Sequence, residues 1–296
     1  MKYMRLFIIM ILVLPGSSLP SLGQYSSQPT NCGSSDQSDP NSAAEVSSPD
    51  SSKNTLPVEL DRLLDQVEQA GAKLKSIQAD MVFKQEQILL DTVTLRNGKL
   101  YYQTDGKTVK ARIYFSDFLQ KDLEEPKLAR RIVFNEDFAF DGQWVRRRNE
   151  RTNSRQLWEV SKSPHNKEAF RLGKGPFPLP FSIQKKDVVE HFEIASVKAD
   201  PCDPPQCRHL KLIPRKKSPY AEEYLRMDLW ISQRTALPEQ ISYEKDDFEI
   251  TMVTWTKPVI DKKIKDSIFA LPAVGRDWPP PEIHRLEEST PKTDAP

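Results

Sequence analysis

The feature that most constrains the fold of this chain is a run of three strand patterns that begins at Ser76. From Ile77 to Phe83 every second residue is apolar, which is the period of a β-strand with one buried face. Two further runs, Thr92–Gln103 and Lys110–Phe118, are rich in β-branched and aromatic residues. Three consecutive strands predict an antiparallel meander. They contain no cluster of acid, base, nucleophile or metal-ligating side chains, so they indicate a binding surface and give no sign of catalysis.

The dipeptide Asn97-Gly98, inside the second run, allows two interpretations. Asn-Gly between apolar stretches is a strong signal for a two-residue hairpin. Alternatively, one long strand continues through a bulge, because the apolar residues change from odd-numbered to even-numbered positions across the glycine. We favour the bulge for a reason given below.

The N-terminus predicts an export signal. Lys2 and Arg5 precede nine apolar residues, Leu6–Leu14, and small residues at Ser21 and Gly23 provide a cleavage site before Gln24. The alternative is a membrane anchor, but nine residues are too few where a spanning helix needs about 20. Gln24 stands where a lipoprotein would need its cysteine. We therefore expect a signal peptide over residues 1–23 and an unlipidated periplasmic product.

Composition divides the remaining chain into a tether, one folded domain and a tail. Residues 24–54 are dominated by Ser, Pro, Asp and Asn, which predicts a disordered linker. Leucines at helical spacing predict an amphipathic helix over Val58–Lys75 at the start of a domain spanning residues 55–279. Residues 280–296 are polar, and we expect a flexible tail.

Strand patterns recur to the end of this domain, interrupted once. They lie at Arg131–Asn135, Phe138–Arg147, Gln156–Ser161, Phe192–Lys198, His209–Pro214, Leu225–Ser232, Gln240–Tyr243 and Phe248–Lys257. Between them, Ser163–Leu172 and Ile183–His191 favour short helices around the irregular segment Gly173–Phe181. The fold class is therefore α+β: an unclosed antiparallel β-barrel of about 10–11 strands, with a leading helix and a mid-chain helical lid.

Charge and histidine placement argue against several functions. Lys plus Arg number 43 against 42 for Asp plus Glu, which gives no general attraction to nucleic acid. Arg146, Arg147, Arg148, Arg151 and Arg155 form a basic patch between Trp144 and Trp158, which we interpret as a solvated hairpin end. The four histidines have no ligand-spaced partners. We expect no enzyme activity, no metal and no cofactor.

Two of the three cysteines predict a disulfide. Cys202 and Cys207 enclose Asp-Pro-Pro-Gln, which favours a tight turn, and an exported chain meets an oxidising compartment. We expect these two to pair, which leaves Cys32 as the odd thiol.

The order of several short motifs resembles the periplasmic outer-membrane lipoprotein carriers (LolA-like proteins) over about residues 58–278. The leading helix runs into a Ser-Ile-Gln-Ala-Asp-Met-Val-Phe-Lys-Gln strand at Ser76–Gln85, and Asn97–Tyr102 is similar to the family's second strand. The other matching segments are Phe138–Val145, Pro176–Leu179 and Phe269–Gly275. The family has a glycine in its second strand, which is why we favour a bulge at Gly98.

The resemblance implies about eleven strands in an unclosed barrel, with helices covering an apolar cavity that takes acyl chains. The aromatic residues expected to line it are Phe83, Tyr101, Phe115, Trp144, Phe177, Phe181 and Trp230. The family fastens its lid with an arginine at the end of the second strand. That position is Thr104 here, and Arg112 is the nearest basic residue for a lid contact.

The function implied is binding of the acyl chains of lipids or lipoproteins in the cell envelope, by a protein expected to be monomeric. The alternative is a protein-interaction or stress-sensing domain of the same fold, without a transport role.

Overall fold

The structure, a computed structural model, describes residues 56–122, 129–161, 181, 183–246 and 248–286. The predicted signal peptide, the linker, the helix at Ser163–Leu172, Cys32 and Phe177 lie outside these residues. The helices are α2 (Val58–Lys73) and α3 (Lys185–His191), with single 3₁₀ turns η1 (Ile88–Leu90) and η5 (Asp266–Phe269).

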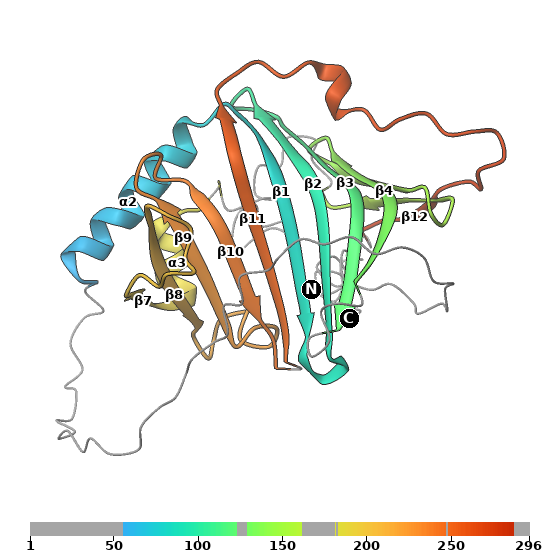
Figure 1. The fold of residues 1–296 in the computed structure, drawn as a ribbon. Coiled ribbons are helices and arrows are strands. Elements are labelled where there is room, and N and C mark those ends of the chain that lie inside the picture. The colour runs from blue at the N-terminus through green and yellow to red at the C-terminus, as the bar shows by residue number, and fades with distance from the viewer. Residues whose placement is uncertain (1–55, 123–128, 162–180, 182, 247, 287–296) are drawn as a thin grey trace, which may run out of the picture.

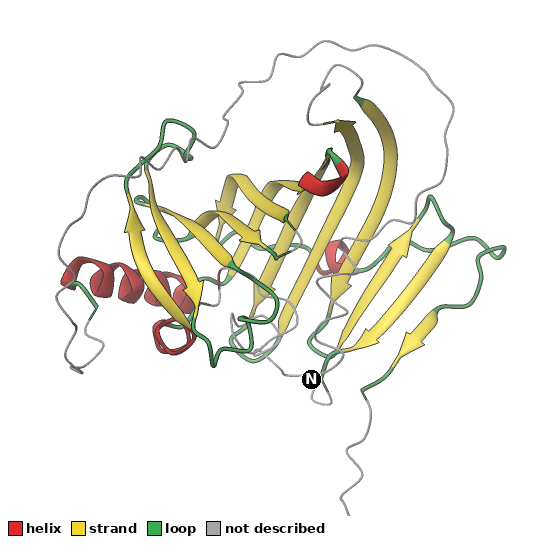
Figure 2. Cartoon of the chain, turned by 90° about the horizontal axis from the view of Figure 1, so that it is seen from below, coloured by secondary structure: helices red, strands yellow, loops and turns green. Residues whose placement is uncertain are grey.

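Twelve strands form one sheet. They are β1 (Ser76–Gln87), β2 (Thr92–Thr104), β3 (Val109–Asp122), β4 (Arg130–Phe140), β5 (Trp144–Asn149), β6 (Ser154–Glu159), β7 (Phe192–Val197), β8 (Cys207–Pro214), β9 (Arg226–Ser232), β10 (Pro238–Glu244), β11 (Glu249–Ile260) and β12 (Glu282–His284). Their order is β12-β6-β5-β4-β3-β2-β1-β11-β10-β9-β8-β7. The sheet is curved and its end strands do not pair with each other (Figures 1 and 2). The predicted fold class, an unclosed antiparallel barrel with added helices, is confirmed, with twelve strands instead of ten or eleven.

Two meanders meet at the centre of this sheet. The strands β1 to β6 pair in sequence, as do β7 to β11, and the two sets join where β1 pairs with β11. That ladder runs from Ile77↔Ile260 to Gln87↔Glu249, so residues more than 160 positions apart lie side by side.

The chain does not turn at Asn97-Gly98. The strand β2 continues through both residues, so the long-strand interpretation is right and the hairpin is wrong. The ladder to β3 shifts register between Asn97↔Asp117 and Gly98↔Phe115, and the extra residue is Ser116 of β3. A Cβ on Gly98 would lie 2.1 Å from the carbonyl oxygen of Tyr114, so only glycine fits here.

One face of the sheet, called the inner face here, carries the hydrophobic core. Its side chains include Met81, Phe83, Tyr102, Phe115, Leu210, Leu229 and Trp255, all buried. The helix α2 packs Leu60, Leu63, Leu64 and Val67 into the same core. Their spacing of three and four residues places them on one side of the helix.

The two helices are also linked by polar contacts. The Lys185 ammonium group, at the start of α3, lies 2.8 Å from both Asp61 and Asp65 of α2. The Lys185 amide also donates to Glu68, at 3.2 Å. These contacts hold α3 against α2.

The C-terminal segment is anchored to the sheet as far as residue 286, which corrects the prediction of a flexible tail for residues 280–286; the remainder of the predicted tail lies outside the described residues. After β11 the chain passes η5 and reaches β6, where β12 pairs with it in parallel (Figure 1). The Arg155 guanidinium donates to the Pro279 carbonyl at 2.8 Å, and the His284 ring stacks on Trp158. A strand of three residues, as short as β12, is too short for a reliable sequence signal.

Candidate functional site

Three of the aromatic residues expected in a cavity lie on the inner face. The rings of Phe83 and Phe115 meet edge to face at 6.2 Å. Phe181 lies 6.3 Å from Tyr102 and 5.6 Å from Trp255, ring centre to ring centre. Its backbone is so close to α2 that a Cβ on Gly71 would lie 2.3 Å from the Phe181 oxygen. Phe181 therefore sits between α2 and the middle of the sheet.

Three other expected lining residues lie on the opposite, outer face. Register places Tyr101 beside Arg112, Trp144 beside Glu159 and Trp230 beside Gln240, all facing away from the core. The Trp230 ring stacks on His209 at 4.3 Å and its indole N–H donates to Asp203. The prediction that these three line the cavity is wrong, because strand register places them on the face opposite Phe83 and Phe115. For Trp230, the strand β9 is buried on both faces, so its alternation does not identify the inner one. Phe177 lies outside the described residues.

Sequence reasoning missed the aromatic residues that do share the inner face. Tyr102 and Trp255 contact Phe181, and Phe138 meets Phe115 at 6.4 Å. Tyr102 of β2 pairs with Ile77 of β1, so the alternation in β1 identifies the face of Tyr102 once this pairing is known.

The inner face also carries charged groups, which were not predicted. The Glu136 carboxylate, fully buried, lies 3.5 Å from Arg96 and accepts a bond from Arg147 Nε at 2.6 Å. The Asn149 amide reaches the same carboxylate at 3.4 Å, and Arg147 donates to Gln156 at 2.9 Å. This inner charge cluster (Arg96, Glu136, Arg147, Asn149, Gln156) borders the aromatic group.

Aromatic rings surround the two cations of the cluster. The Arg96 guanidinium lies 5.5 Å from the centre of Phe83 and 5.8 Å from that of Phe115, and Arg147 lies 5.7 Å from Phe138. The pKa of Arg96 lies below its usual value, chiefly because the guanidinium is buried. The Glu136 charge opposes this shift, and the nearby Arg147 charge adds to it. The inner face near β4–β6 therefore combines buried aromatic and aliphatic side chains with a charged cluster.

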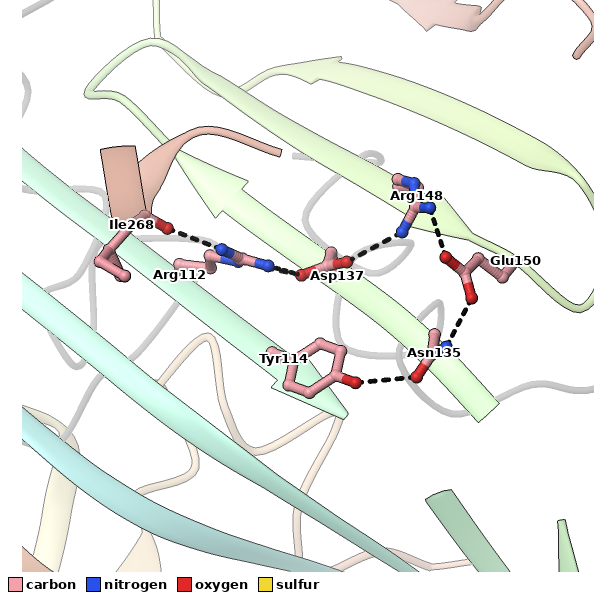
Figure 3. A network of polar contacts seen from close by, with 7 residues as sticks. All are labelled: Arg112, Tyr114, Asn135, Asp137, Arg148, Glu150 and Ile268. Atoms are coloured by element: carbon pink, nitrogen blue, oxygen red, sulfur yellow. Dashed lines mark hydrogen bonds and ion pairs between the residues drawn. The ribbon is translucent and has the colours of Figure 1, made fainter. Parts of the chain in front are cut away.

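The outer face holds a second network, shown in Figure 3. Arg112 donates to the Asp137 carboxylate from Nε at 2.9 Å, and Arg148 donates to the other Asp137 oxygen at 3.3 Å. Arg148 also bonds Glu150, which accepts from Asn135, which in turn accepts from the Tyr114 hydroxyl at 2.8 Å. The Asn135 amide hydrogen bond, followed by Arg148, holds the pKa of Glu150 below its usual value.

Most of the mid-chain lid that Arg112 was predicted to contact lies outside the described residues, and within them Arg112 contacts the C-terminal segment. Its remaining terminal nitrogen donates to the carbonyl of Ile268, in η5, at 2.9 Å (Figure 3). Arg148 lies over the ring of Trp278, 5.4 Å from its centre. Both arginines therefore fix the C-terminal segment to the outer face, away from α2 and α3. The basic patch is likewise not a solvated tip, because Arg147 and Arg148 are engaged by buried carboxylates.

The predicted disulfide between Cys202 and Cys207 is wrong. Cys207 is a free, buried thiol at the start of β8, and its sulfur lies 3.7 Å from the Glu239 carboxylate of β10, two strands away in the sheet. Burial, and after it the Glu239 charge, raises the pKa of this thiol to about 12. The Cys207 side chain is turned towards Glu239, because the strand geometry of β8 sets its direction.

The described residues contain no group of three or more His, Cys, Asp or Glu side chains placed to hold a metal ion. Among the same residues, no helix combines the length and the apolar character needed to cross a bilayer. The residues brought together are thus a buried apolar aromatic group and two ion-pair networks.

Comparison with known proteins gives structural likeness only. No family model matches the chain, and no curated protein matches it. Among solved structures, it is similar to MucB of Pseudomonas aeruginosa in complex with MucA, at 12% identity and a TM-score of 0.40, over 73% of this chain and 62% of that one. A LolA superfamily protein of Nitrosomonas europaea is similar at 9% identity and 0.32, over 71% of this chain and 97% of the other. The Mycobacterium tuberculosis lipoprotein LppX is similar at 10% and 0.38, over 69% and 98% respectively. These proteins include the superfamily that the sequence motifs resemble.

Proposed function

We propose that this protein is exported to the cell envelope and binds acyl chains of lipids or lipoproteins on the apolar part of its inner face. The observation that carries the proposal is the position of Phe181. It is the one described aromatic ring that meets the inner face from the segment between β6 and α3, and it contacts Tyr102, Trp255 and the backbone of α2. A ligand that replaced this ring would enter an environment of aromatic and aliphatic side chains.

The energetics are adequate for such a ligand. Burying one methylene gains about 0.8 kcal/mol, so ten gain on the order of 8 kcal/mol, which corresponds to a micromolar dissociation constant before the costs of association. Phe83, Phe115 and Phe181 are at most 6% exposed. These rings therefore fill the described part of the inner face, and binding requires that the Phe181 ring is displaced.

The experiment is displacement of a fluorescent fatty acid, together with native mass spectrometry of protein purified from membranes. Saturable binding and co-purified lipid are the expected results. Absence of saturable binding to the wild-type protein would refute the proposal.

A second candidate is an envelope protein-interaction domain of the same fold. The buried aromatic rings of the inner face favour this second candidate, because a domain that binds a partner protein on its outer surface does not need an internal cavity for a ligand. Under this candidate the protein carries no lipid after purification and does not bind the fluorescent fatty acid.

A further inference from the structure

Exposed apolar side chains gather at the end of the sheet where β1 and β10 stop and β2 and β11 begin. Leu89 is 71% exposed, Leu90 66%, Phe248 57% and Ile88 49%. They come from two hairpin turns that lie side by side, because β1 pairs with β11 and the Ile88 amide donates to the Phe248 carbonyl at 3.4 Å. We call these four residues the apolar tip. Figure 1 shows the β1–β2 turn projecting at the lower end of the sheet.

The backbone of both turns holds these side chains outward. Phe248 has φ of +60° and Asp91, directly after η1, has φ of +51°. The left-handed region is rare for a bulky residue and costs of order 1 kcal/mol or more. Because more than half of the Phe248 side chain is exposed, packing of its ring contributes little stability to offset this backbone strain. The exposure is therefore a built property of the two hairpins.

The charges beside the tip do not favour an anionic surface. Lys84 and Lys245, the lysines nearest along β1 and after β10, are each held at 2.5 Å by a carboxylate, Glu86 and Glu249 respectively. Asp122 and Asp246 are exposed close by, against the single half-buried Lys121. Among the residues that the structure describes at this end of the sheet, a partner that depends on basic residues, such as an acidic lipid layer, finds no excess of positive charge.

The size and shape of the tip favour a lipid layer over a protein. Four side chains expose on the order of a few hundred Å² of apolar surface, whereas a stable protein interface buries about 1,200 Å² or more. An acyl layer is deformable and can surround a small projection.

We propose that the apolar tip inserts into the outer part of a bilayer with uncharged headgroups and so docks the protein on a membrane. This proposal does not depend on acyl binding by the inner face, since the tip lies at the ends of the strands and shares no residue with it.

The test is flotation with phosphatidylcholine vesicles, using the protein as purified after export. The double variant Leu89→Ser/Leu90→Ser is expected to partition at least about tenfold less than the wild type. Val259→Ser, an exposed valine at the opposite end of β11, is the matched control and is expected to partition like the wild type. Failure of the wild type to float, or equal flotation of the wild type and the double variant, would overturn the proposal.

A second variant addresses the case in which the double variant does not fold. Asparagine adopts positive φ more readily than phenylalanine, so Phe248→Asn relieves strain while removing the exposed ring. Its thermal midpoint is expected to be unchanged or higher while its partitioning falls. Vesicles of phosphatidylglycerol are expected to bind the wild type more weakly at low salt, and stronger binding there would overturn the assignment of an uncharged surface.

Discussion

Gly98 lies so close to Tyr114 that the strands β2 and β3 meet at this point without room for any side chain. The Tyr114 carbonyl oxygen would be 2.1 Å, and Phe115 Cδ1 3.0 Å, from a Cβ on Gly98. Gly98→Ala must therefore separate the backbones next to the irregularity at Ser116. We expect a loss of about 2–4 kcal/mol of unfolding free energy, measured by urea denaturation.

The control for this substitution is Gly106→Ala in the β2–β3 turn. Gly106 has φ of +88° but nothing within 4 Å of an added Cβ, so it reports backbone strain without a steric clash. We expect a smaller loss there, of about 1 kcal/mol. A loss at Gly98 no larger than that at Gly106 would contradict the close approach.

Removal of Arg112 tests the outer network. The Asp137 carboxylate is 1% exposed and would retain only Arg148, at 3.3 Å, while Ile268 would lose its donor. We expect Arg112→Met to cost about 2–4 kcal/mol, because one partner of a buried pair is lost. Lys110→Met, which removes an exposed ion pair with Asp266 on the same strand, is the control. We expect this control to lose less than about 1 kcal/mol of unfolding free energy. Equal losses for the two variants in urea denaturation would contradict a larger contribution from the buried Arg112–Asp137 pair.

Phe181→Ser separates a role in acyl binding from a role in packing. If an acyl chain takes the place of the Phe181 ring, the substitution removes that competing ring and raises fatty-acid affinity, read by displacement. Trp230→Ser removes an equally buried aromatic ring from the outer face and is expected to lower the thermal midpoint without changing affinity. A Phe181 variant that loses stability but keeps the wild-type affinity would assign the ring to the core alone.

The Cys207 thiol is expected to resist alkylation. Its pKa is raised from 9.0 to about 12 by burial and by Glu239, so the folded protein holds the neutral thiol at pH 8. Iodoacetamide should label this residue quickly only after unfolding. A thiol with a raised pKa favours the folded state below pH 9, and this contribution is lost as the pH rises from 9 towards 12. The difference in stability between the wild type and Cys207→Ser should shrink over that interval.

Sequence patterns were sufficient for elements whose burial is one-sided. The leading helix was expected over Val58–Lys75 and spans Val58–Lys73, because its leucines mark one face. The opening meander is likewise present, since the alternation in β1 is uninterrupted. The face of each aromatic residue was harder to predict. Tyr101 and Tyr102 differ by one position and face opposite sides, and only the pairing of β2 with β1 decides between them.

The charge cluster could not be predicted because its members come together through register. Arg96, Glu136 and Arg147 lie on three different strands, and each is ordinary in its local sequence. The prediction of a flexible segment after Pro279 was also wrong. The three residues of β12 pair with β6, more than 120 positions earlier in the sequence, and a local sequence pattern does not reveal so distant a partner.

The pairing of β1 with β11 has a consequence for how the protein is made. The second edge of β1 has no partner until the chain has been synthesised as far as Ile260, because β11 supplies it. Folding must then close a segment of more than 160 residues, a long-range step that is slow for sheet proteins. A nascent chain of this protein thus keeps an open strand edge on β1 until β11 has left the ribosome.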